Sequence, residues 1–258
     1  MAGRYTLADV LATRKSRDSW WTVYLVDPLA CPVALVVANH TRWTPNGLTA
    51  GSLVLGMASA VCFGLDQLVA GAALFYVSFL LDCVDGKIAR LKGTGTPFGL
   101  WLDYVGDRIR VVCCATGLAY GQFTLTHDVI YVVLGAVVAV LDLFRYVNAP
   151  QMKRVRGAIL GPPVPGRPAS PPEGPRFMPG LNGFLARHRV RAHLISGIEF
   201  HAAVFVVAPL TGVLLPIAAV ASVLLLANEV FIVYRMWLFT RRVPAVPQES
   251  RQHALIGG

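Results

Sequence analysis

The chain has 258 residues, of which 55% are hydrophobic and only 14% are charged, and its mean hydropathy is +0.57. Soluble domains carry about 25% charged residues, so this composition excludes an ordinary soluble protein. The net charge of +9 would suit nucleic-acid binding, but Lys and Arg are missing from three long stretches, residues 43–86, 111–144 and 192–234. This is the positive-inside pattern of a membrane protein with a basic cytosolic face, so nucleic acid is not an expected partner.

Residues 1–43 are expected to form a cytosolic tail followed by an interfacial helix. The first 18 residues are polar and are expected to be a flexible lead. The stretch SWWTVYLVDPLACPVALVVAN (Ser19–Asn39) is apolar, but Pro28 and Pro32 make it a poor membrane-spanning helix. Its tryptophan pair favours a helix along the interface, and a seventh span is the alternative.

Residues 44–240 are expected to form a domain of six membrane-spanning helices. TPNGLT (Thr44–Thr49) opens the first span, and later apolar blocks predict the next three, the fourth at Val129–Tyr146. The block Ile198–Trp237 is too long for one span, so its internal turn residues predict spans five and six. The expected fold class is an all-α integral membrane protein with six transmembrane helices and an N-terminal interfacial helix.

Two polar regions complete this layout. The stretch at about residues 150–194 includes GPPVPGRPASPPEGPR, which cannot bury an apolar core, and is expected to be a cytosolic loop. Residues 241–258 are expected to be a polar cytosolic tail. The sequence thus predicts a multi-pass protein of the cell membrane with both termini on the cytosolic side.

Four aspartates lie near the predicted cytosolic ends of spans two and three. Asp82 and Asp85 are three residues apart, and Asp103 and Asp107 are four apart, so each pair shares one face of its helix. Neighbouring antiparallel helices can therefore bring both pairs together, where the carboxylates would repel one another unless a positive group lay between them. Arg90, Arg108 and Arg110 could supply part of that charge. Hard divalent cations such as Mg²⁺ or Mn²⁺ bind carboxylate and phosphate oxygens, so the pattern predicts a two-metal phosphate site.

Small and basic residues follow the first pair. Gly86 and Ala89 lie on the same side of the helix as Asp82 and Asp85 and leave room for a flat group. Arg90 offers a forked donor that suits phosphate. These residues indicate a nucleotide diphosphate group at the membrane surface.

The pattern D-x2-D-G-x2-A-R-x8-G-x3-D-x3-D, from Asp82 to Asp107, resembles the complete signature of the CDP-alcohol phosphotransferase family. The resemblance implies an enzyme of phospholipid biosynthesis, which moves a phosphatidyl group from CDP-diacylglycerol or a similar donor to a polar alcohol and releases CMP. It also implies that Asp82, Asp85, Asp103 and Asp107 hold two divalent cations, Mg²⁺ or Mn²⁺, and that Asp107 is the general base. The nucleotide-binding set that it implies is Asn46, Thr49, Asp85, Gly86, Ala89, Arg90 and Gly99. Members of the family commonly form homodimers, so a homodimer surrounded by membrane lipids is expected.

The acceptor is less specifically indicated. Arg145, Lys153, Arg154 and Arg191 are candidates for binding an anionic acceptor such as inositol phosphate or glycerol phosphate, although positive-inside bias alone would explain them. The same chemistry with a CDP-linked polar alcohol as donor and a lipid as acceptor is an alternative. A divalent cation transporter is a further alternative, but it predicts acidic groups deeper along several spans, where only Asp142 and Glu229 come close. Glu199 and His201 are interpreted as polar contacts within the bundle.

Overall fold

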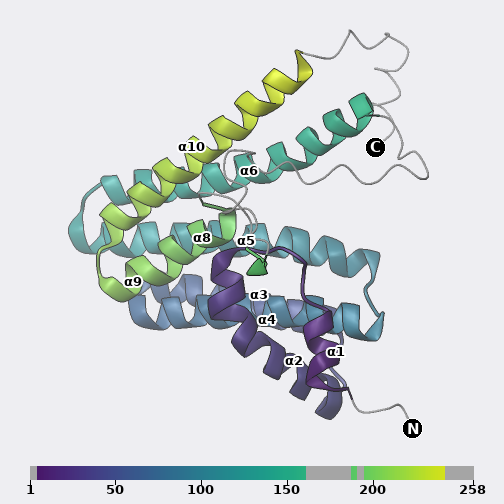
Figure 1. Cartoon of the computed structure of the whole chain (residues 1–258). Coiled ribbons are helices and arrows are strands. Elements are labelled where there is room, and N and C mark those ends of the chain that lie inside the picture. Colours follow the sequence, from purple (N-terminus) through teal and green to yellow (C-terminus); the bar gives the residue numbers. More distant parts are fainter. Residues whose placement is uncertain (1–4, 161–186, 191–194, 242–258) are drawn as a thin grey trace.

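The structure is a computed structural model that describes residues 5–160, 187–190 and 195–241 (Figure 1). Within these ranges the regular elements are all helical, which confirms the all-α prediction. They are α1 (Leu7–Ala12), the π-helical turn η1 (Thr22–Val26), α2 (Asp27–His40), α3 (Pro45–Gly64), α4 (Leu68–Lys92), α5 (Pro97–Thr126), α6 (Ile130–Leu160), α8 (Gly197–Ala202), the π-helical turn η2 (Ala203–Val207), α9 (Ala208–Thr211) and α10 (Leu214–Thr240).

Five described helical stretches are long and apolar enough to cross a membrane: Thr22–His40, Pro45–Gly64, Leu68–Lys92, Ile130–Ile159 and Leu214–Thr240. Helix α5 has 30 residues, but its first half carries the charged groups of the motif. The helical stretch Gly197–Thr211, where the fifth span was predicted, is apolar but shorter than the others. Length and composition alone therefore do not reproduce the predicted count of six spans.

Helices α3 and α5 begin in the same way. Thr44 and Thr96 are N-caps whose side chains accept hydrogen bonds from the backbone N–H of Gly47 and Gly99, and a proline occupies the first turn of each helix. Helix α4 ends at Gly93, which has a φ of 63°, a left-handed conformation that costs glycine little. These signals fix the ends of the three helices that carry the motif.

Helices α3, α4 and α5 pack side by side, and α6 and α10 lie along each other and run obliquely away from them (Figure 1). The backbones of α3 and α5 come very close together. A Cβ added to Gly117 would collide with the carbonyl oxygen of Ala60, and a Cβ added to Gly121 would collide with that of Phe63. Phe205 of η2 packs on Phe75 of α4 with their ring centroids 4.8 Å apart. The C-terminal helices are thus joined to the motif helices by an aromatic core.

The structure differs from three expectations. Thr22–His40 is continuous rather than broken, because the π-helical turn η1 leads directly into α2, and the helix accommodates both Pro28 and Pro32. Residues 5–18 are not a flexible lead, since Thr6 and Asp9 form a capping box that opens α1. Helix α6 continues to Leu160, so the predicted loop at about 150–194 begins about ten residues later than expected, after the helix-forming stretch QMKRVR. Of the rest of that loop, only residues 187–190 are among the described residues.

Candidate active site

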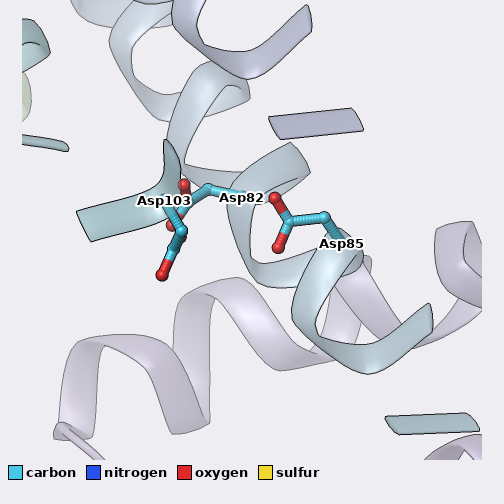
Figure 2. A group of neighbouring side chains, drawn as sticks. All are labelled: Asp82, Asp85 and Asp103. Carbon is cyan, nitrogen blue, oxygen red and sulfur yellow. The ribbon is translucent and has the colours of Figure 1, made fainter. Parts of the chain in front are cut away.

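Helices α4 and α5 bring three of the four predicted carboxylates together. Each of Asp82, Asp85 and Asp103 offers an oxygen that lies within 4.8 Å of the others, and the three side chains gather in one place (Figure 2). Among the described residues this is the one group of three or more His, Cys, Asp or Glu side chains so close together. Its all-oxygen donor set fits a hard divalent cation such as Mg²⁺ or Mn²⁺.

Asp107 points to a different set of partners. Its Oδ1 accepts a hydrogen bond from Nη2 of Arg110, and its Oδ2 lies 3.6 Å from Nη2 of Arg108. Arg110 is only 3% exposed, and its Nη1 lies 3.7 Å from Asp82 Oδ1. Two of the three arginines expected to neutralise the aspartates therefore do so.

Helix α3 contacts side chains of the site on both α4 and α5. Thr49 Oγ1 is hydrogen-bonded to Asp85 Oδ2, which orients that carboxylate. Arg110 Nη1 donates to Ser52 Oγ at 3.1 Å and to Ser78 Oγ at 3.2 Å. The side chain of Arg110 also covers Gly56, where an added Cβ would lie 2.7 Å from Cγ and Cδ of the arginine. A larger residue at position 56 would displace the cation from the carboxylates.

A cavity of about 240 Å³ lies against these carboxylates. Its wall contains all four motif aspartates together with Gly86 and Arg90 from the predicted nucleotide set. Asn46, Thr49, Ala89 and Gly99 are not part of this wall. Asn46 and Gly99 instead meet around Thr96, with Asn46 Nδ2 3.2 Å from Thr96 Oγ1, and a Cβ on Gly99 would collide with Asn46.

Comparison with known proteins identifies the part of the chain that carries this site. The CDP-alcohol phosphatidyltransferase family model matches residues 42–165. Over these residues the chain is similar to members of that family. With its long apolar helices, the chain is a multi-pass membrane protein.

Individual relatives match over shorter stretches. A CDP-diacylglycerol–serine O-phosphatidyltransferase of Helicobacter pylori is 32% identical over 100 residues, which are 36% of this chain and 42% of that protein. A phosphatidylinositol phosphate synthase of Mycobacterium marinum is 39% identical over 67 residues, 26% of this chain and 29% of that protein. The chain thus aligns with less than half the length of these relatives.

One solved structure extends the likeness to the whole fold. The Mycobacterium tuberculosis phosphatidylinositol phosphate synthase, crystallised with CDP-DAG bound, superimposes with a TM-score of 0.58 at 20% sequence identity. The match covers 81% of this chain and 94% of that one. It shows that the described helices share the fold of that protein.

The four predicted acceptor-binding residues are not all brought to the cavity. Arg145 lines the cavity, and its Nε lies 3.3 Å from Glu229. It also packs over Gly197, where an added Cβ would collide with the guanidinium. Lys153 and Arg154 are exposed on the last turns of α6 and are not part of the wall. Arg191 lies outside the described residues.

The sequence interpretation placed His201 in polar contacts within the bundle, but it did not identify the buried network beside Asp107 to which His201 belongs. Asp142, which is only 1% exposed, accepts a hydrogen bond from Arg108 and lies 2.7 Å from Nε2 of His201. His201 and Arg108 both line the cavity, and the Arg108 guanidinium lies 4.0 Å from the centre of the Tyr146 ring. The sequence contained one signal for this network. Asp142 stands alone in an apolar span, and carboxylates inside a membrane are rarely without a partner.

The N-terminal segment is the second feature that was missed. Arg14, Lys15 and Asp18 line the cavity from a stretch that was expected to be flexible. Arg90, which was expected to hold the nucleotide, donates from Nε to the carbonyl of Thr13 at 2.8 Å. The segment precedes the family match, so the motif gave no reason to place it at the site.

Proposed function

We propose that this protein transfers a phosphatidyl group from CDP-diacylglycerol, or a similar CDP-linked donor, to the hydroxyl of a polar alcohol and releases CMP. The observation that carries the proposal is the gathering of Asp82, Asp85 and Asp103 at a cavity that Asp107, Gly86 and Arg90 also line. The four aspartates, Gly86 and Arg90 all lie within residues 42–165, which the CDP-alcohol phosphatidyltransferase family model matches. The names of the relatives, which act on serine or make phosphatidylinositol phosphate, support an acceptor of the polar-alcohol class.

Two divalent cations, Mg²⁺ or Mn²⁺, are part of this proposal. Asp82, Asp85, Asp103 and Asp107 would hold them, and the close approach of three of these carboxylates supports such a site. When bound, the ions would neutralise the pyrophosphate and the charge that develops on the leaving CMP. The carboxylates alone would repel one another and the substrate.

The protein's own groups would orient the reactants and move one proton. Asp107 takes the proton of the acceptor hydroxyl, and the resulting oxygen attacks the phosphorus that carries the diacylglycerol. The bond from that phosphorus to the oxygen of CMP breaks, so CMP leaves with the electron pair. Arg110 and Arg108 hold the two oxygens of Asp107 in place, and Gly86 leaves space for the nucleotide.

The orientation of the site is part of the same proposal. The basic residues next to the cavity, in the last turns of α4 and before α8, support a site that opens on the cytosolic face. Arg145 is the acceptor-binding residue that the cavity supports best, since Lys153 and Arg154 are not part of its wall.

The test is CMP release by the purified protein with CDP-diacylglycerol, a panel of polar alcohols, and Mg²⁺ or Mn²⁺. We expect release with one acceptor, loss with a chelator and recovery when metal is restored. Asp107→Asn should lower kcat by at least about 100-fold, because a positioned base contributes about that much or more.

Asp128→Asn is the matched control, since Asp128 lies in the turn before α6 and caps Ile130. It should release CMP at the wild-type rate. Release that needs a CDP-linked polar alcohol as the donor would reverse donor and acceptor. If the protein released no CMP and also failed to bind CDP with metal, the proposed function would be wrong.

A further inference from the structure

The cavity is lined by seven Lys and Arg residues, and four of them are already paired with carboxylates. Lys87 lies 2.8 Å from Asp27, Arg145 lies 3.3 Å from Glu229, Arg108 is bonded to Asp142, and Arg110 is bonded to Asp107. The other three, Arg14, Lys15 and Arg90, have no carboxylate within ion-pair distance in the described part of the chain. They are the cations of this wall whose charge no described carboxylate offsets by an ion pair.

Two of these three cations belong to the N-terminal segment, and several hydrogen bonds hold that segment against the site. Arg189 donates to the carbonyl of Lys15 from Nε at 3.1 Å and from Nη2 at 2.7 Å. The backbone N–H of Asp18 donates to the carbonyl of Arg189 at 2.8 Å, and Arg90 donates to the carbonyl of Thr13. The backbone beside Arg14 and Lys15 is therefore fixed at both ends, while the side chain of Lys15 is exposed.

The charge of the proposed substrate shows what those cations would bind. In the proposed site, four aspartates and two divalent ions cancel in charge, so the pyrophosphate of the donor still needs positive partners. A buried or half-buried phosphate charge is costly unless charged donors satisfy it. Arg14 uses Nε for the carbonyl of Leu11 at 3.1 Å, which leaves the rest of its guanidinium for another acceptor.

We propose that Arg14 and Lys15 bind the pyrophosphate of the CDP-linked donor, so that a segment outside the family match completes the nucleotide site. This inference rests on the proposed function. It goes beyond the motif, because residues 5–18 precede the matched range 42–165. The cavity places these cations on the same wall as Asp82 and Asp103. Arg90 then has two roles, since it holds the segment through Thr13 and faces the same cavity.

The test is equilibrium binding of CDP, and separately of CMP, to the full-length protein in detergent with Mg²⁺. We expect Lys15→Ala together with Arg14→Ala to weaken CDP binding by about tenfold or more, the value of one or two charged hydrogen bonds. CMP, which lacks the second phosphate, should lose less. Lys15→Arg keeps the charge and should bind CDP within about threefold of wild type.

Arg17→Ala is the matched control, because Arg17 is an exposed cation of the same segment that is not part of the cavity wall. It should bind CDP as the wild type does. The Tm of each variant without ligand is measured alongside, which separates a lost ligand contact from a misfolded segment.

The outcomes distinguish this inference from the proposed function. If the wild type binds CDP and the double variant binds it equally well, the inference is wrong and the proposed function stands. If the wild type itself does not bind CDP with metal, the proposed function is wrong and this inference falls with it.

Discussion

At the scale of single residues, the least expected feature is the network behind the proposed base. Arg108 lies between two carboxylates, because one of its nitrogens donates to Asp142 and the other lies 3.6 Å from Asp107. Asp142 is in turn 2.7 Å from His201 Nε2. Asp142 does not touch the cavity, so it acts on the site through Arg108, as a positioning residue.

Asp142→Asn is therefore expected to lower kcat by about tenfold or more and to leave the KM for the donor almost unchanged. The neutral side chain would hold Arg108 less firmly, and a small displacement of a reacting group is costly for the rate. Steady-state kinetics with each substrate varied in turn measures this split between kcat and KM. A raised donor KM with normal kcat would contradict the positioning role.

Glu229→Gln gives the matched comparison. Glu229 is similarly buried, at 2% exposure, but its partner is Arg145 rather than Arg108. Because Arg145 is the proposed acceptor-binding residue, this variant should change the KM of the acceptor rather than the kcat. The two variants together separate a role in the chemistry from a general loss of stability.

At the scale of helices, the site depends on how closely α3 and α5 approach each other. Thr49 on α3 holds Asp85, while α5 supplies Asp103 and Asp107, so the spacing of these two helices sets the geometry. A Cβ on Gly121 would meet the backbone carbonyl of Phe63, which cannot move without the helix. Small residues at membrane helix contacts serve this purpose.

Gly121→Ala should therefore destabilise the protein by about 1–3 kcal/mol, the usual cost of overpacking, and lower CMP release as well. Thermal unfolding in detergent measures the first effect. Gly157→Ala in α6 is the control, since nothing lies within 4 Å of the added Cβ, and alanine should stabilise that exposed helix by about 0.5–1 kcal/mol. An unchanged Tm in Gly121→Ala would mean that the helices tolerate a wider spacing.

Helical periodicity predicted only those parts of the site that depend on one helix at a time. The spacing of Asp82 and Asp85 on α4, and the helix starts at Thr44 and Thr96, follow from local rules. The pair of Arg110 and Asp107, three residues apart on α5, is local in the same way, whereas the bond of Arg90 to Thr13 depends on packing between segments 77 residues apart. No local pattern encodes such contacts, so the N-terminal wall of the cavity was not predicted.

At the scale of the whole molecule, the helix Thr22–His40 raises the question of how many times the chain crosses the membrane. Its length and apolar character permit a span. Its first residues, Thr22 and Asp27, line the cavity, however, and Asn39 near its end exchanges hydrogen bonds with the backbone of Tyr5 at 2.9 and 3.0 Å. Both ends of this helix thus lie near the N-terminal segment that borders the site.

This arrangement favours the predicted interfacial helix, and so six spans with both termini on one side. The topology is measured with single cysteines, introduced into a background without the five native cysteines. Each is tested for labelling by a membrane-impermeant reagent in sealed vesicles. Ser16→Cys and Arg241→Cys should react from the same side, and Gln67→Cys, in the turn between α3 and α4, from the other. If position 16 reacted together with position 67, Thr22–His40 would cross the membrane. Lys15 could then not reach the same cavity as Asp82, because the two would lie on opposite faces of the bilayer.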